Sequence, residues 1–267
     1  MGFFGRKRAP SVPHPRKEPR FDGPLTLKRL EQIFQDCVDF TKRPVSLGEG
    51  GACTLTLCYL SGMVKMERVS DYVLRPLAQD EALARCGTPR QAMEEMMGGA
   101  LYNLSAAERT TLDEAAFDLV AGWCLMFFPG ESAVLSLFVG TEEKRSISSP
   151  SNETVLKGSR DAFVESLRTN TSIVRRHLKT RSELRIREQV VGRQSVTSVD
   201  ILYIEGLTNP HLVEQVAAQL ADIDIDAVLA TGNIEEYIVP AARTAFPLVQ
   251  YTERSDRFCA GLAEGRV

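Results

Sequence analysis

A pattern of 17 residues that occurs twice, with similar but not identical sequence, is the feature that most constrains the fold of this chain. Residues 57–73 read LCYLSGMVKMERVSDYV and residues 201–217 read ILYIEGLTNPHLVEQVA, and the two align without a gap at an offset of 144. In each copy an apolar run leads through a glycine, Gly62 or Gly206, into a segment with apolar residues at helical spacing. The pattern predicts a buried strand, a glycine turn and a helix in both places.

Two interpretations of this internal similarity stay open at this point. Any strand that enters a helix through a glycine turn gives a similar pattern, so the match can be generic. The alternative is an α/β fold of two tandem small α/β subdomains, each a mixed sheet flanked by helices. With 267 residues, 43% of them hydrophobic, the chain is long enough for two such units. We expect them at residues 25–149 and 150–267.

Residues 1–24 differ from the rest in composition. They hold six basic side chains, two acidic ones and five prolines, so we expect a disordered basic tail. Two phenylalanines precede the charges, the reverse of the order in a secretory signal, and export by that route is not expected. The most apolar window, residues 119–128, covers about half of the roughly 20 residues that a membrane span needs. The sequence therefore predicts a chain that does not cross a membrane.

Helices and strands are expected to alternate in the first unit. Thr26 is placed to cap a first helix that runs toward Pro44. Residues 52–60 and 133–139 read as strands, and residues 90–128 look largely helical.

The second unit shows the same alternation. Ser159 is placed to cap a helix, and residues 183–191 and 196–204 predict an antiparallel hairpin. Asn209 stands before a proline, the preferred start of the helix that follows.

No residue pattern predicts catalysis, a cofactor or a metal site. The six cysteines are scattered without a CxxC pair, which favours reduced, packed thiols in a reducing compartment. The loop Gly48–Gly51 is followed by a predicted strand and lacks the lysine of a phosphate-binding loop. The alternating Asp222, Asp224 and Asp226 lack the glycine and glutamate of a calcium loop. No serine has a histidine and an aspartate that sequence can place around it, so we expect a chain that is not an enzyme.

A basic run lies in the second unit. Its members are Arg175, Arg176, His177, Lys179, Arg181, Arg185 and Arg187. No aromatic side chains interleave them, so nucleic acid is not an expected partner. The first members would end a helix, where cations complement the macrodipole, and the last two would lie on the solvent face of a strand. We expect a solvated surface, with a patch facing a membrane or a partner as the alternative.

Four phrases, taken in order, resemble the soluble N-terminal region of the A subunit of bacterial spore nutrient germinant receptors, the GerA family. They are GSRDAFVESLRTN (Gly158–Asn170), YIEGLTNPHLVEQV (Tyr203–Val216), IDIDAVLATGNIEE (Ile223–Glu236) and FPLVQYTERSDRF (Phe246–Phe258). The match covers almost all of residues 150–267 and is looser over residues 25–149.

The resemblance implies a non-enzymatic part of a nutrient-gated membrane complex in spore germination. Such A subunits resemble oligomeric ion channels that act with a nutrient-sensing B subunit and a lipoprotein C subunit in the inner spore membrane. The implied partners are therefore A, B and C type subunits, including further copies of the chain. The N-terminal region is implied to lie on the cytoplasmic, spore-core side. Family members continue beyond the equivalent of Val267 into transmembrane helices, so we expect the soluble domain alone or a truncated gene, with membrane attachment through segments absent from this chain.

The same phrases supply candidate contacts for a partner or a ligand. These are Arg160, Asp161, Gly206, Asn209, Glu235, Glu236, Tyr251, Glu253, Arg254 and Asp256. Five of them are expected to fix the geometry of the motifs or to contact neighbouring subunits, namely Arg160, Asp161, Glu253, Arg254 and Asp256. An alternative function is a two-lobed small-molecule binding module that resembles solute-binding proteins, with residues 61–65 and 205–209 lining its cleft.

Overall fold

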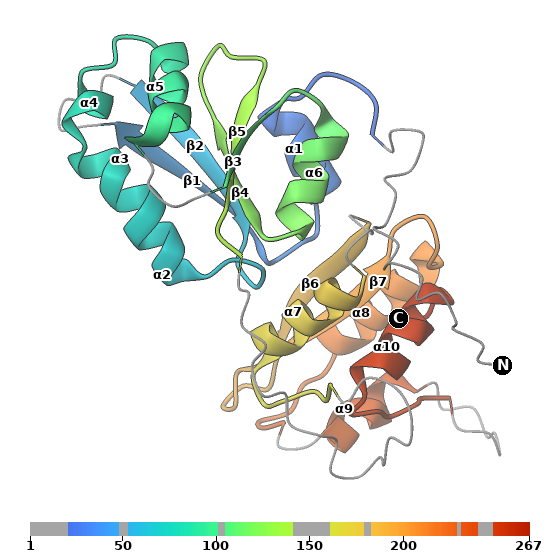
Figure 1. Cartoon of the computed structure of the whole chain (residues 1–267). Helices are drawn as coiled ribbons and strands as arrows, with labels where there is room; N and C mark the ends of the chain where they lie inside the picture. Colours follow the sequence, from blue (N-terminus) through green and yellow to red (C-terminus); the bar gives the residue numbers. More distant parts are fainter. Residues whose placement is uncertain are drawn as a thin grey trace, which may run out of the picture.

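The computed structural model describes residues 21–47, 53–100, 105–140, 161–178, 183–228, 231–239 and 248–267. The described strands form one five-stranded sheet and one two-stranded sheet, and helices flank both (Figure 1). The fold is thus a mixed α/β arrangement, as expected.

The first sheet has the strand order β1-β2-β4-β5-β3, and every pairing in it is antiparallel. Side chains of β2 alternate between two buried layers, since Leu55 and Leu57 face one core while Cys58 and Leu60 face the other. Both faces of this sheet are therefore buried. Its strands are β1 (Phe40–Leu47), β2 (Cys53–Leu60), β3 (Ala106–Arg109), β4 (Trp123–Phe127) and β5 (Val134–Phe138).

Helices cover the two faces of the first sheet. On one face lies a series of short helices in which Val69, Val73 and Leu77 are fully buried, as their spacing predicts. On the other face lie α1 (Leu27–Ile33) and α6 (Leu112–Val120). The short helices are α2 (Met66–Arg68), the π-helical η1 (Val69–Leu74), α3 (Arg75–Gln79), α4 (Glu81–Ala84), α5 (Pro89–Glu95) and the π-helical η2 (Met96–Ala100).

The second sheet is a hairpin with both faces covered. Helices α7 and α10 share a core with one face, where Ile186 and Leu202 point. Helices α8 and α9 pack against the other face, where Ile201 points. The elements are α7 (Leu167–His177), β6 (Leu184–Val191), β7 (Thr197–Ile204), α8 (Pro210–Ala221), α9 (Thr231–Ile238) and α10 (Ser255–Ala263).

The expectation of mixed sheets was wrong, because the pairings within both sheets are antiparallel. Among the described residues, the parallel pairing is a single bridge between Cys37 and Ile186. Three strands that the sequence pattern did not reveal account for the difference. Strand β1 lies where a helix was expected to run toward Pro44, and an edge strand tolerates that proline. Strands β3 and β4 both lie within residues 90–128, the region expected to be largely helical, and β4 pairs antiparallel with β2 and with β5.

The capping predictions had mixed outcomes. The hydroxyl of Thr26 accepts the N–H of Arg29 at 3.3 Å, and the side chain of Asn209 accepts the N–H of His211 at 3.0 Å, which confirms both caps. Helix α7 begins later than expected, at Leu167, with Ser166 as its N-cap. Ser159, the expected cap, lies outside the described residues.

The similarity between residues 57–73 and 201–217 is also found in the backbone structure. Strands β6 and β7 begin and end at residues that lie 144 positions after the ends of β1 and β2, and the two hairpins have the same register. The carbonyl of Leu60 accepts the N–H groups of Met63 and Val64, and the carbonyl of Ile204 accepts those of Leu207 and Thr208. Helices α1 and α7 also end at positions 144 apart. This agreement favours a repeated helix–hairpin–helix unit over the generic interpretation.

A buried ion pair joins the two copies of this unit. The guanidinium of Arg175 donates to the carboxylate of Asp39 at 2.5 and 2.7 Å, and the two side chains are 1% and 2% exposed. Beside the pair, the N–H of Val38 donates to the carbonyl of Ile186 at 2.9 Å, and the N–H of Ile186 donates to the carbonyl of Asp36 at 3.0 Å. The segment before β1 thus adds to the free edge of β6. We call this contact, residues 36–39 with Arg175 and Ile186, the joint.

Replacing Asp39 by alanine should lower the free energy of unfolding by about 3–5 kcal/mol, because Arg175 would remain buried without its counter-charge. The double variant Asp39→Leu with Arg175→Met should recover most of that loss, since an apolar pair needs no desolvation of charge. Chemical denaturation measures both. Glu81→Ala is the matched control, because the Glu81–Arg85 pair is exposed and its loss should cost less than about 0.5 kcal/mol. Equal losses for Asp39→Ala and Glu81→Ala would contradict the structural role of the joint.

Candidate functional site

The first and last of the four phrases meet at a short antiparallel bridge. Ala162 pairs with Arg254, the N–H of Phe163 donates to the carbonyl of Glu253 at 2.8 Å, and the N–H of Ser255 donates to the carbonyl of Asp161 at 3.3 Å. The bridge ties the segment before α7 to the segment before α10. We call it the clasp. Segments that lie 92 positions apart in the sequence are therefore neighbours in the fold.

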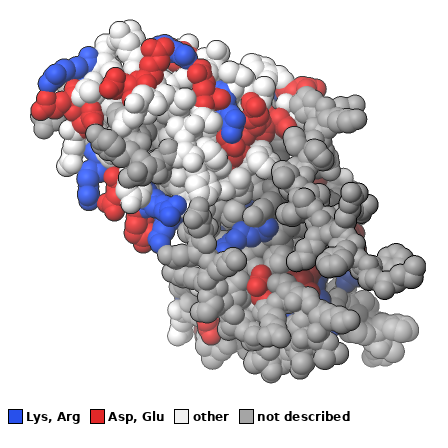
Figure 2. Space-filling view, in the orientation of Figure 1, with Lys and Arg blue, Asp and Glu red and all other residues white. Residues whose placement is uncertain are grey.

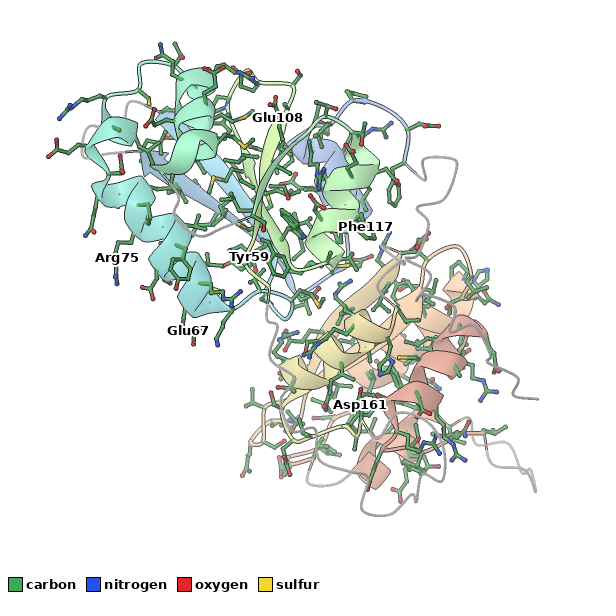
Figure 3. All side chains as sticks on the ribbon, in the orientation of Figure 1. Tyr59, Glu67, Arg75, Glu108, Phe117 and Asp161 are labelled. Atoms are coloured by element: carbon green, nitrogen blue, oxygen red, sulfur yellow. The ribbon has the colours of Figure 1, made fainter. Side chains whose placement is uncertain are left out.

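Side-chain hydrogen bonds stabilise the clasp in addition to its backbone bonds. The hydroxyl of Ser255, a fully buried residue, donates to the carbonyl of Asp161 at 3.0 Å, and Nε2 of His177 lies 3.1 Å from the same hydroxyl. Nε2 of His177 also lies 3.5 Å from the carboxylate of Asp161. Figure 3 labels Asp161 between α7 and the C-terminal helix. The side chain of Asn170 bonds both the N–H and the carbonyl of Val164, which fixes the approach to α7.

Arg254 forms its ion pair within its own phrase. Its guanidinium donates to both carboxylate oxygens of Asp256, at 3.0 and 2.6 Å. This hydrogen-bonded pair holds the pKa of Asp256 below its ordinary value. The backbone N–H of Arg254 donates to the hydroxyl of Thr252 at 3.0 Å, so this threonine orders the turn but does not cap α10, which begins at Ser255. The ion pair of Arg254 and Asp256 thus stabilises the turn that leads into α10.

A hydrogen bond from a tyrosine joins the third phrase to the fourth. The hydroxyl of Tyr251 donates to the carboxylate of Glu235, which lies in α9. Glu236, the next residue along α9, is exposed and points elsewhere, as adjacent helical residues do. Tyr251 itself is 52% exposed.

The remaining candidates lie apart from the clasp or outside the described residues. Gly206 and Asn209 lie in the turn between β7 and α8, where Gly206 adopts a φ of +75° that favours glycine. Arg160 lies outside the described residues. The structure therefore brings Asp161, Glu253, Arg254 and Asp256 together, joins Glu235 to Tyr251, and places Gly206 and Asn209 in a separate turn.

Two residues of the basic run do not lie on a solvated surface, and that interpretation was wrong for them. Arg175 is buried in the joint, and Arg185 is 9% exposed. The first three residues of β6, Leu184, Arg185 and Ile186, are all buried, so the strand offers no solvent face at Arg185. The expected position of the first members was correct, since Arg175, Arg176 and His177 form the last turn of α7.

Sequence reasoning missed the joint itself. Asp39 has no motif around it, and Arg175 was grouped with its basic neighbours. One signal was present: Arg175 follows the buried Val174 and lies four residues after Thr171, on the buried side of the helix. A basic residue in that position needs a counter-charge inside the protein.

The contacts of the candidate residues are ion pairs and hydrogen bonds within the fold. Charged groups of the clasp pair with one another, and Figure 2 shows positive and negative side chains interspersed over the short helices of the first unit. Within the described ranges, no cluster of three metal-ligating side chains occurs. Of the helices in that part of the chain, none combines the length and the apolar character needed to cross a membrane.

Comparison with known proteins identifies the family. The protein-family model described as Bacillus/Clostridium GerA spore germination protein matches residues 28–267 of this chain. An uncharacterized membrane protein of Bacillus subtilis (strain 168), YfkQ, is 35% identical over 240 residues, which are 90% of this chain and 45% of that protein. Spore germination protein KA of the same strain is 32% identical over 230 residues, 85% of this chain and 41% of that protein. The chain spans less than half the length of both relatives.

A solved structure matches the fold as well. The crystal structure of the N-terminal domain of the A subunit of the Bacillus megaterium spore germinant receptor GerK3 superposes with a TM-score of 0.69 at 26% identity. The match covers 90% of this chain and 86% of that one. These matches confirm the resemblance that the four phrases suggested: the chain belongs to the GerA family of spore germination proteins.

Proposed function

We propose that this chain is the N-terminal region of an A-type subunit of a spore germinant receptor and that it acts in spore germination. The observation that carries the proposal is the match to the GerK3 A-subunit domain, which extends over 86% of that domain. A non-enzymatic role agrees with the geometry, because the motif residues pair with one another at the clasp.

The proposed architecture is two subdomains, residues 25–149 and 150–267, after a basic tail at residues 1–24. The repeated helix–hairpin–helix unit supports this division, since one copy lies in each half. In the full-length protein the region would lie on the cytoplasmic, spore-core side of the inner spore membrane. Its partners would be A, B and C type subunits, including further copies of this chain.

The proposed mechanism is assembly and signal coupling in a nutrient-gated ion channel complex. The joint links the two subdomains through a buried ion pair, and the clasp links the start of the second subdomain to its last helix. A displacement of α10 would therefore be carried through the clasp to α7, and through Arg175 to the first sheet. The joint is buried, and the clasp is built on the buried Ala162 and Ser255, so a shift at one contact would be passed on through close-packed groups.

Charge reversal at Arg254 tests this proposal. In the full-length receptor, Arg254→Glu should reduce subunit assembly and germination, because a second carboxylate would lie beside Asp256. Germination of spores and recovery of the receptor complex are the measurements. Arg85→Glu is the matched control, since Arg85 is exposed and pairs within its own helix. Normal assembly and normal germination with Arg254→Glu would count heavily against the proposal.

The alternative, a two-lobed small-molecule binder, makes a different prediction. Residues 61–65 would line its cleft, yet Gly62 packs against Ser172 of α7. Thermal-shift screening of nutrients and ions on the purified chain should therefore leave the melting temperature unchanged. A specific ligand at 100 times its Kd would add about 2.7 kcal/mol of stability, so a clear and saturable rise would favour the binder.

A further inference from the structure

The first copy of the repeated turn carries a docked helix. A Cβ placed on Gly62 would lie 3.2 Å from Cβ of Ser172 and 3.6 Å from the carbonyl oxygen of Arg168, both in α7. Arg175 of the same helix reaches Asp39, the residue just before β1. This end of a hairpin therefore accepts a helix that offers a small residue to the glycine and, three residues later, an arginine to the carboxylate.

The second copy of the turn has the same backbone hydrogen bonds but no such helix among the described residues. No described heavy atom would lie within 4 Å of a Cβ on Gly206. Leu207 is 45% exposed, whereas its counterpart Met63 is 7% exposed. One flank of the turn meets the end of α10, where Gly265 packs against Leu207. The surface that α7 covers in the first copy is thus exposed to solvent or to a partner in the second, within the described part of the chain.

A carboxylate stands at the same position beside both turns. Glu183 stands just before β6, as Asp39 stands just before β1. Glu205, the neighbour of Gly206, is 55% exposed at its side chain and lies 3.8 Å from Arg185. The carboxylate at the position of Asp39, with the exposed Leu207 beside the turn, favours a helix that carries a cation and an apolar contact.

A second copy of this chain does not supply that helix. The counterpart of α7 in the first copy is α1, and it has Lys28 where α7 has Ser172 and Glu31 where α7 has Arg175. A lysine would crowd the glycine, and a glutamate would face like charge. Helix α7 of another copy is held in its own joint by Asp39.

We propose that the turn between β7 and α8, residues 205–208, together with Glu183, is a docking site for an arginine-bearing helix of a partner polypeptide of different sequence. The proposal rests on the proposed function and deepens it, because it names the surface on which a neighbouring subunit would act. The recognition pattern is a small residue over Gly206 and an arginine three residues later.

A labelled peptide tests the site on the purified chain. The probe is residues 165–178 of this protein, stapled into a helix through positions 165 and 169, because an isolated helix of this length is marginal. Fluorescence anisotropy should show saturable binding to the chain. Leu207→Arg and Glu205→Arg should each weaken it by about tenfold or more, a change equivalent to about 1.4 kcal/mol. Val190→Arg, at a residue 58% exposed near the opposite end of the hairpin, should leave it unchanged.

Changes in the peptide give a control that cannot unfold the chain. The peptide with Arg175→Glu should bind at least about tenfold more weakly. Absence of saturable binding, or binding that Leu207→Arg does not weaken, would overturn the proposal. Tighter binding of a stapled peptide of residues 21–34, which contains α1, would identify a second copy as the occupant and would also overturn it. The titration contains no other receptor subunit and no spore, so its failure would leave the proposed function to be judged by the Arg254→Glu experiment.

Discussion

The buried pair of Asp39 and Arg175 is the interaction on which the arrangement of the two halves depends. Two charges withdrawn from water are tolerated only when their geometry is good, and the bidentate contact meets that condition. The pair sets the position of α7 against the first sheet, and a Cβ on Gly62 would come within 3.2 Å of Cβ of Ser172, a tight contact. The backbone bonds of Val38 and Ile186 then continue β6 into the first unit. A buried polar contact thus joins the two copies of the unit, while the apolar clusters of each half contain residues of that half alone.

The sequence predicted the elements in which one signal dominates. The β6–β7 hairpin, the caps at Thr26 and Asn209, and the buried stripe of Val69, Val73 and Leu77 follow from local pattern alone. Strand β1 was missed because its side chains are mostly partly or fully exposed at a sheet edge, so no alternation of buried residues marks it. Strand β3 is short and lies between helices, where periodicity over a longer window favours helix. Strand β4 was also hidden in the region expected to be helical, and sheet direction could not be predicted because it depends on where β1, β3 and β4 insert.

The candidate site was predicted in part. The four phrases marked residues that the fold joins, since Asp161 and Ser255 share the clasp and Tyr251 bonds Glu235. Their pairing across the sequence could not be read from the chain, because each phrase is explained locally by caps and turns. The joint was invisible for a different reason: Asp39 and Arg175 lie 136 positions apart, and each looks like an ordinary surface charge among its neighbours.

Hydrogen exchange of the amides of Val38 and Ile186 tests most directly whether the two copies form one cooperative structure through the joint. If they do, both amides should exchange only with the global unfolding of the chain, as the central amides of β2 do. Exchange of Val38 and Ile186 through a local opening, at a free energy well below that of the β2 amides, would contradict it. In that case the two halves would be separate domains in loose contact, and the joint could not transmit a displacement.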